Sequence, residues 1–294
     1  MPPRLLLGLI LGLGASAIWG GHAVVARLAL AGQGFHVLDL AAMRYLPAAI
    51  LFAPLAWQAR ASLLRLGLWR LLVLTGAGGV GNLLLFVGAL QYAPASHGGT
   101  IAPMTGPVVS ALMGWWLLKE RPTPGRVAAL ATMLLGVLLI GWDGLGSDLP
   151  LVWLGDLLLV AAGATWGCFG ALIRLWQVPA IPAAAGVSIL SALLIAPPWL
   201  IGPAADFLAM PLSLQLWMIF AQGVLLGVVS LLLFARSLEI LGPTRTATLS
   251  VFVPVAALLL AALILEERMG TLQLLGAAVA VGGMLAAVLF TGRR

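Results

Sequence analysis

The sequence contains very few charged residues. Of its 294 residues, 8% are charged and 62% are hydrophobic, whereas an ordinary soluble domain carries roughly 25% charged residues. So few charges cannot cover the surface of a water-soluble globule, which indicates an integral membrane protein. The net charge of +6 is then expected to come from Lys and Arg in loops on one side of a membrane, and no nucleic-acid partner is predicted.

Cysteine and catalytic motifs are also scarce. The single cysteine, Cys168, excludes an intrachain disulfide and any metal site built from several thiolates. The three histidines lack H-x-x-x-H and H-E-x-x-H spacing, so no metal site is predicted. No G-x-S-x-G motif is present, and Ser110, Ser188 and Ser230 have no obvious paired histidine. An intramembrane enzyme is therefore the least favoured class, and no cofactor is expected.

The hydrophobic residues form runs that are long enough to cross a bilayer as helices, which needs about 20 mainly apolar residues each. There are ten such runs: 5–30, 39–57, 70–91, 96–118, 127–142, 151–175, 181–201, 213–235, 245–265 and 271–290. A transmembrane β-barrel would show strict alternation of apolar and polar residues, which is absent. The predicted fold class is an all-α integral membrane protein with ten transmembrane helices.

Basic residues are distributed unevenly between the two predicted sides. With the N-terminus in the cytoplasm, twelve of the fifteen Lys and Arg residues fall on the cytoplasmic side, and the opposite side keeps Arg27, Arg44 and Arg268. This is the positive-inside pattern, and an even number of spans also puts both termini on one side. We expect a multi-pass protein of the bacterial inner membrane with both termini in the cytoplasm.

The first span has two possible readings. The stretch "GASAIWGGHAVVAR" (14–27) contains an A-x-A form typical of signal-peptide cleavage. However, "AGATWGCFGALIR" (162–174) repeats its Trp-Gly pair and closing Arg 147 residues later. The same shift places Gly8 on Gly155, Pro107 on Pro254, Glu120 on Glu267, Arg121 on Arg268 and Gly136 on Gly283. The first span is therefore expected to be retained, as part of a duplication into repeats 1–147 and 148–294.

Each repeat contains five predicted spans, an odd number, so the two repeats are expected to cross the membrane in opposite directions. Inverted repeats of this kind place a substrate site near the membrane midplane, where the halves meet. A duplication that only enlarged a helix bundle is the alternative. A tethered soluble domain is excluded, because no loop is long enough to fold alone.

Paired motifs point to a known family. The first span of each half contains "AIWGG" (17–21) or "ATWGC" (164–168), and the fourth span contains Pro107 or Pro254 and closes in "LLKERPTPG" (117–125) or "LILEERMGT" (263–271). Over essentially its whole length the chain resembles the ten-span drug/metabolite transporter superfamily, EamA type, including its exporters of aromatic and neutral amino acids. The resemblance implies a solute carrier whose first, third and fourth helices in each half surround the cavity.

Polar and aromatic residues in the middle of spans are the candidates for that cavity. A Trp at the midplane, such as Trp19 or Trp166, needs a partner or a watery cavity, because Trp prefers the interface. Asn82, the only asparagine, and Gln222 lie in corresponding spans and are expected to give the cavity two polar walls. Helix-to-helix packing is the alternative for all of them. The candidate substrate-binding residues are Trp19, His22, Asn82, Phe86, His97, Trp166, Phe169, Gln222, Ser230 and Phe234. Pro103, Pro107 and Pro254 are candidate hinges or static kinks.

Acidic residues are missing from the middle of the spans. All nine lie in loops or within about two turns of a span end: Asp39, Glu120, Asp143, Asp148, Asp156, Asp206, Glu239, Glu266 and Glu267. Proton-driven carriers usually keep a carboxylate in the membrane, and the small multidrug proteins related to this family use a Glu in their first span. Either His22 or His97 carries a proton, or the protein is an uncoupled facilitator, which is the favoured interpretation.

A cavity without fixed charge would suit neutral or zwitterionic solutes, because an ionic solute would lose its hydration without compensation. The predicted function is a secondary transporter that exports small neutral or zwitterionic metabolites, including aromatic amino acids, by alternating access. The alternative is a proton-coupled exporter of drugs or organic cations. A purely structural scaffold explains neither Asn82 nor the paired Trp residues. The expected partners are the solute and the lipid bilayer, with a monomer or a homodimer as the assembly.

Overall fold

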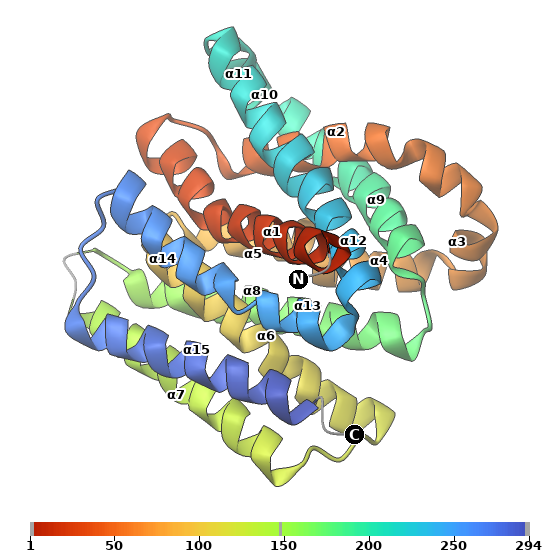
Figure 1. Ribbon diagram of the computed structural model, residues 1–294. Coiled ribbons are helices and arrows are strands. Elements are labelled where there is room, and N and C mark those ends of the chain that lie inside the picture. Colours follow the sequence, from red (N-terminus) through yellow and green to blue (C-terminus); the bar gives the residue numbers. More distant parts are fainter. Residues whose placement is uncertain (1–2, 147–148, 292–294) are drawn as a thin grey trace.

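The structure is a computed structural model that describes residues 3–146 and 149–291. The expected boundary between 1–147 and 148–294 lies outside these residues, as do Asp148, Arg293 and Arg294. Within the described ranges every regular element is a helix (Figure 1). The elements of the first half are α1 (Pro3–Arg27), η1 (Leu28–Gly32), α2 (Val37–Gln58), α3 (Arg60–Leu66), α4 (Leu68–Gly78), α5 (Val80–Ala89), α6 (Ala95–Leu118) and α7 (Pro124–Leu145).

The second half has the same order of long helices. Its elements are α8 (Val152–Leu175), α9 (Ala180–Ile201), α10 (Ala204–Ala209), α11 (Leu212–Met218), η2 (Ile219–Val229), α12 (Ser230–Leu241), α13 (Pro243–Leu249), α14 (Phe252–Ile264) and α15 (Thr271–Thr291). The segments η1 and η2 are π-helical. The two prolines of run 181–201, Pro197 and Pro198, lie inside α9, which continues to Ile201.

In the described ranges, nine helical segments are long and apolar enough to cross a membrane, and they match nine of the ten predicted runs. Run 245–265 differs, because it is divided between α13 and α14. The 13-residue α14 extends about 20 Å, less than the roughly 30 Å of a bilayer core. The prediction of ten transmembrane helices is therefore confirmed for nine segments of the described ranges.

The third span is broken at Gly79, and the break is repaired by a neighbouring helix. Leu68–Ala89 consists of α4 and α5, with Gly79 between them. A break frees backbone groups that cannot find water inside a bilayer. The Ser191 hydroxyl of α9 accepts a hydrogen bond from the Val80 N–H at 3.0 Å. A side chain at Gly79 would collide with this hydroxyl, since its Cβ would lie 2.5 Å away.

The first helices of the two halves run in opposite directions, as an inverted repeat requires. Helix α8 is parallel to α6, because Gly155 lies against Ala93 just before α6 begins, and Arg174 pairs with Glu120 just after α6 ends. Helix α1 is antiparallel to α6, because Ala23, near the end of α1, lies against Gly98, near the start of α6. The two halves are also interleaved, with α7 and α15 packed side by side (Figure 1).

Glycines hold the helices together at equivalent places in the two halves. A Cβ on Gly20 would lie 2.6 Å from the Val253 carbonyl oxygen, and Gly167 makes the equivalent close approach to the Gly106 oxygen. Residues 106 and 253 are 147 apart, as are 20 and 167. Such contacts between backbones need a residue without a side chain. The offset found in the sequence is thus repeated in the packing.

The pair α7 and α15 follows the same rule. A Cβ on Gly136 would lie 2.5 Å from the Gly276 oxygen and 2.6 Å from the Ala280 nitrogen. A Cβ on Gly283 would lie 2.9 Å from the Ala129 oxygen and 2.8 Å from the Met133 nitrogen. These partners are also related by the offset of 147, which supports the assignment of the duplication.

Replacing Gly283 by alanine is expected to lower the free energy of unfolding by about 1–3 kcal/mol, because the added methyl group meets the α7 backbone, which cannot move aside. Gly282→Ala is the matched control, since nothing lies within 4 Å of its Cβ position, and its effect should be neutral or slightly stabilising. Thermal unfolding in detergent, followed by tryptophan fluorescence, measures both. Equal melting temperatures for the two variants would contradict the packing argument.

Candidate functional site

Trp19 and Ser230 form a hydrogen bond between the halves in the interior of the bundle. The Trp19 Nε1–H on α1 donates to Ser230 Oγ on α12 at 2.9 Å, and the buried Ser230 hydroxyl donates in turn to the Leu226 carbonyl. The Phe234 ring lies one turn further along α12, with its centroid 5.0 Å from the Trp19 ring. Three of the candidate residues therefore lie together, and the indole N–H of Trp19 has a polar partner, as a Trp in the middle of a span needs.

Asn82 forms the corresponding bridge between α5 and α8. Its Nδ2 donates to the Ala162 carbonyl at 2.6 Å and to Thr165 Oγ1 at 2.9 Å. Thr165 precedes Trp166, the equivalent of Trp19 in the second half. Asn82 therefore corresponds to Ser230 rather than to Gln222. The two residues are 148 positions apart, one more than the repeat offset of 147. The amide joins two helices, as the packing alternative predicts.

The expected pairing of Asn82 with Gln222 is not observed. Gln222 lies in η2, which packs against α2, where a Cβ on the next residue, Gly223, would lie 2.7 Å from the Met43 oxygen. The Gln222 side chain is completely buried, and neither its Nε2 nor its Oε1 has a hydrogen-bond partner among the described residues. The two residues were paired because they occupy similar positions along the third span of each half. The long π-helical segment η2 turns Gln222 toward a different neighbouring helix.

Trp166 and Phe169 lie on one side of α8. Their rings are stacked with centroids 5.4 Å apart, and the Phe169 ring covers Gly78 at the end of α4. Trp166 keeps 52% of its surface exposed. Trp166 therefore differs from its repeat equivalent Trp19, because Trp19 is partly buried by α12.

His22 lies one turn after Trp19 and faces α5. Its ring stacks on Phe86 with centroids 4.8 Å apart and planes 14° apart. The His22 Nε2 is buried and has no hydrogen-bond partner among the described residues. Arg44 lies close enough for its charge to act on His22.

Arg44 is the functional candidate that the sequence analysis missed. The count of basic residues assigned it to the non-cytoplasmic side, but it is the eighth residue of α2 and lies within the bundle, with Nη1 buried and unbonded. The part of the bundle around His22 therefore carries a fixed charge, whereas the sequence analysis expected none there. Its position inside run 39–57 was the available signal.

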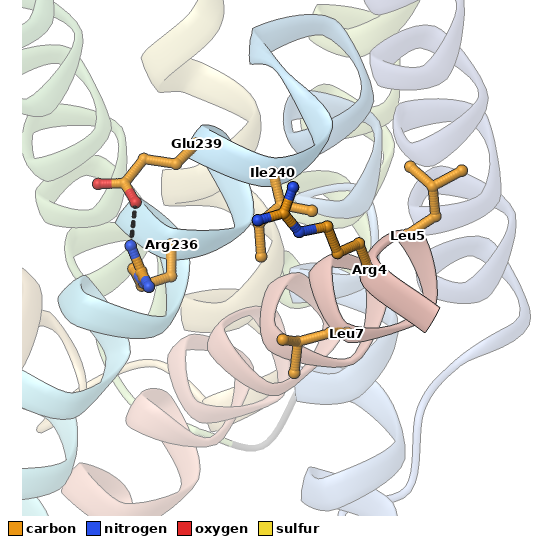
Figure 2. A pocket seen from close by; sticks show the side chains of 6 residues that line it. All are labelled: Arg4, Leu5, Leu7, Arg236, Glu239 and Ile240. Carbon is orange, nitrogen blue, oxygen red and sulfur yellow. Dashed lines mark hydrogen bonds and ion pairs between the residues drawn. The ribbon is translucent and has the colours of Figure 1, made fainter. Parts of the chain in front are cut away.

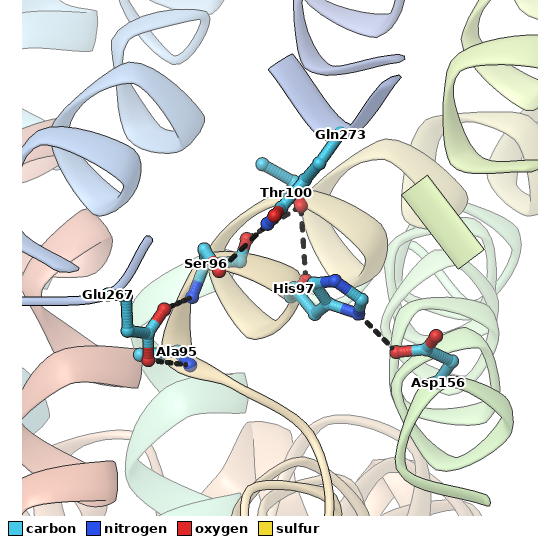
Figure 3. Close-up of polar contacts among 7 residues, drawn as sticks. All are labelled: Ala95, Ser96, His97, Thr100, Asp156, Glu267 and Gln273. Carbon is cyan, nitrogen blue, oxygen red and sulfur yellow. Dashed lines mark hydrogen bonds and ion pairs between the residues drawn. The ribbon is translucent and has the colours of Figure 1, made fainter. Parts of the chain in front are cut away.

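His97 lies apart from these residues, in the first turn of α6, within a network of polar contacts (Figure 3). Its Nδ1 lies 2.7 Å from Asp156 Oδ1 of α8, and both side chains are buried. The Glu267 carboxylate accepts hydrogen bonds from the Ala95 and Ser96 N–H groups, at 2.7 and 2.9 Å. Because these N–H groups begin α6, the carboxylate stabilises the positive end of the helix dipole.

One pocket opens beside His97 and another at the opposite end of the bundle. The first has a volume of about 230 Å³ and is lined by residues that include Ser96, His97, Asp143, Glu267, Arg268 and Gln273. The second, of about 510 Å³, lies between the start of α1 and the end of α12 and includes Arg4, Arg236 and Glu239 (Figure 2). Neither pocket is lined by Trp19, Asn82 or Trp166.

The prolines proposed as hinges lie inside helices that continue past them. Pro103 and Pro107 are in the interior of α6, whereas Pro254 is the third residue of α14 and lies in its first turn. In the described residues, no three His, Cys, Asp or Glu side chains lie close enough to hold a metal ion.

A family model described as "EamA-like transporter family" matches the chain twice, over residues 6–142 and 153–289. The two matches begin 147 residues apart, which is the offset of the repeat. The chain belongs to the EamA-like transporter family. It is therefore a multi-pass membrane transporter of the drug/metabolite superfamily, and the resemblance to the EamA type that its motifs indicated is confirmed.

The EamA-like fold is also found in a solved structure described as "Crystal structure of protein". It is 21% identical, covers 96% of each chain and superimposes with a TM-score of 0.61, so it supports the fold alone. No curated protein matches this chain.

Removing the partner of Asp156 is expected to destabilise this EamA-like protein. His97→Phe leaves a buried carboxylate without its imidazole partner and should lower the free energy of unfolding by about 1–3 kcal/mol. The double variant His97→Phe/Asp156→Leu should recover most of this loss, because no polar group is then left unpaired. Thermal unfolding in detergent compares the two variants. Arg236→Gln, which breaks an exposed ion pair with Glu239, is the control and should lower the free energy of unfolding by at most about 1 kcal/mol. A double variant less stable than the single one would contradict this role.

Proposed function

We propose that this EamA-like transporter carries small neutral or zwitterionic amino acids, including aromatic ones, by alternating access. The observation that carries the proposal is the meeting of the two inverted halves at polar and aromatic side chains in the middle of their spans. Trp19 bonds to Ser230 on one side, and Asn82 bonds to Thr165 beside Trp166 on the other. Inverted-repeat carriers bind their solutes at such a junction.

A difference between equivalent residues supports alternating access. Glu267 accepts hydrogen bonds from the start of α6, whereas its repeat equivalent Glu120 pairs with Arg174 at the end of α8. The halves have related sequences, so identical contacts would be expected at both ends of a static, symmetric bundle. Different contacts at the two ends are what a carrier held in one of its two states would have.

The membrane arrangement follows from the same proposal. The pair α13 and α14 is taken as the ninth span, broken near the midplane, which gives ten spans in all. Both termini then face the cytoplasm of a bacterial inner membrane, as the excess of basic residues favours. The proposed direction is export. The proline positions in α6 and α14 are places where bending could accompany the change of state.

Proton coupling is the second candidate, and one observation favours it. His97 and Asp156 form a buried pair of titratable side chains that joins the two halves. Histidine and carboxylate side chains form the proton relays of pumps and transporters, so this pair is the one that would exchange a proton in a coupled cycle. The substrate in that case would be a drug or an organic cation.

Reconstituted protein in liposomes tests both candidates. The probes are labelled leucine, phenylalanine, glutamate and lysine and the cation tetraphenylphosphonium, each with and without an imposed pH gradient. Saturable uptake of leucine and phenylalanine that ignores the gradient is expected. Accumulation that follows the gradient would replace the uncoupled mechanism, and uptake of tetraphenylphosphonium alone would overturn the proposed substrate.

Trp166→Ala and Asn82→Ala are expected to lower leucine and phenylalanine flux about tenfold, as the loss of one good aromatic or polar contact would. The yield of folded protein should stay near that of the wild type. Trp142→Ala is the matched control, because Trp142 is 71% exposed at the end of α7 and should not affect flux. Normal flux in both test variants would contradict their place in the cavity.

A further inference from the structure

Arg44 lies where α2 packs most closely against η2. A Cβ on Gly223 would lie 2.7 Å from the Met43 carbonyl oxygen, and one on Gly227 would lie 3.5 Å from the Arg44 oxygen. Both glycines bring the η2 backbone against this part of α2. Arg44 is the eighth residue of its helix, which places it about 10 Å along the helix axis from its start. The residue is therefore held well inside the span rather than at its end.

The Arg44 guanidinium is a positive charge without a counter-ion in the described part of the chain. None of the ion pairs found there involves Arg44, and its buried Nη1 has no hydrogen-bond partner. Asp39, the acid on the same helix, instead accepts hydrogen bonds from the His36 N–H and from Trp199 Nε1. An unpaired charge inside a membrane protein is costly and commonly marks a substrate or ion site.

Two further unpaired polar side chains lie on the helices around Arg44. The His22 Nε2 is buried and unbonded, with its ring stacked on Phe86 and within electrostatic range of Arg44. Gln222 precedes Gly223, which contacts α2, and both polar atoms of its buried amide are unbonded. Most buried polar groups in proteins have partners, so three such side chains on α1, α2 and η2 indicate a place that a polar ligand completes.

The chemistry of these side chains selects an anion with a single charge. Guanidinium, amide and imidazole all offer N–H donors, and the guanidinium fork matches the two oxygens of a carboxylate. A phosphate carries more than one charge at neutral pH, whereas the charge found to act on His22 among the described residues is that of Arg44. The Phe86 ring on α5, which stacks on His22, and Trp19, one turn before His22 on α1, suit an apolar group attached to the carboxylate.

We propose that Arg44, together with His22 and Gln222, binds the carboxylate of the transported solute. The inference rests on the proposed function and narrows it, because the solute must carry a carboxylate. Amino acids and aromatic or aliphatic monocarboxylates meet this requirement. Organic cations and amines without a carboxylate do not, since the uncompensated Arg44 charge repels them.

Competition against labelled phenylalanine in liposomes tests the requirement on the wild-type protein. 3-Phenylpropanoate, which keeps the carboxylate and lacks the ammonium group, is expected to inhibit uptake. Phenylalaninamide and phenethylamine, which lack the carboxylate, should not inhibit at equal concentration. Inhibition by the amide as strong as that by unlabelled phenylalanine would overturn the proposal.

Variants of Arg44 supply the second test. Arg44→Met should lower phenylalanine uptake about 100-fold, the effect of removing one partner of a buried charged hydrogen bond, and Arg44→Lys should lower it less. The melting temperature of Arg44→Met without substrate should equal or exceed that of the wild type, because a costly unpaired charge is removed. Arg236→Gln, at an exposed arginine, is the control and should transport normally. Wild-type uptake by Arg44→Met, or a large loss of its stability, would overturn the proposal.

An error in the proposed function can be distinguished from an error in the carboxylate site. If the wild-type protein carries no amino acid, that function is wrong, and the carboxylate site is then judged by thermal shift with 3-phenylpropanoate. A rise in melting temperature in the wild type that is smaller in Arg44→Lys and absent from Arg44→Met would keep the site. No rise in the wild type would overturn it as well.

Discussion

Close contact between helix backbones at glycine is the constraint on which the structure depends. Gly20, Gly136, Gly167 and Gly283 each let one helix approach the carbonyl oxygens or N–H groups of another. In a bilayer the hydrophobic effect does not drive helices together, so close packing of this kind supplies much of their association. Because the contacts occur in pairs 147 residues apart, the same constraint produces both the packing and the internal symmetry. The candidate site residues are then positioned by helices whose spacing these glycine contacts fix.

The spans and the duplication could be predicted from the sequence, because both appear in it as regular patterns. The runs of apolar residues located nine spans, and the repeated glycines, Trp19 with Trp166, and Pro107 with Pro254 revealed the duplication. The broken ninth run was missed because hydropathy reports the length of an apolar stretch but not the continuity of its helix. Such a break depends on how the segment packs against its neighbours, as the Ser191 bond at Gly79 illustrates for the third span.

The site was predicted less well, because polar contacts depend on helix rotation. Trp19, Ser230 and Phe234 do meet, and Asn82 does cross to the second half. Asn82 and Gln222 were paired by their positions along equivalent spans, but the π-helical segment and one residue of slip give them different neighbours. Arg44 was assigned to a membrane surface because counting charges by side assumes that every charge lies near an end. The contacts between α2 and η2 that surround it cannot be read from the sequence, where its position inside run 39–57 was the available signal.

The π-helical segment also has a mechanical consequence for the eighth span. A π-turn holds more residues than an α-turn, so the residues beyond η2 are rotated about the axis relative to an uninterrupted α-helix. Gln222, early in the segment, belongs to the surface against α2, whereas Ser230, directly after it, faces α1. The same span thereby contacts both α2 and α1. A regular α-helix of the same sequence would turn different residues toward these two helices. If the π-helical segment moved beyond Ser230, this residue would rotate about the helix axis and away from Trp19, while the length of the helix stayed the same.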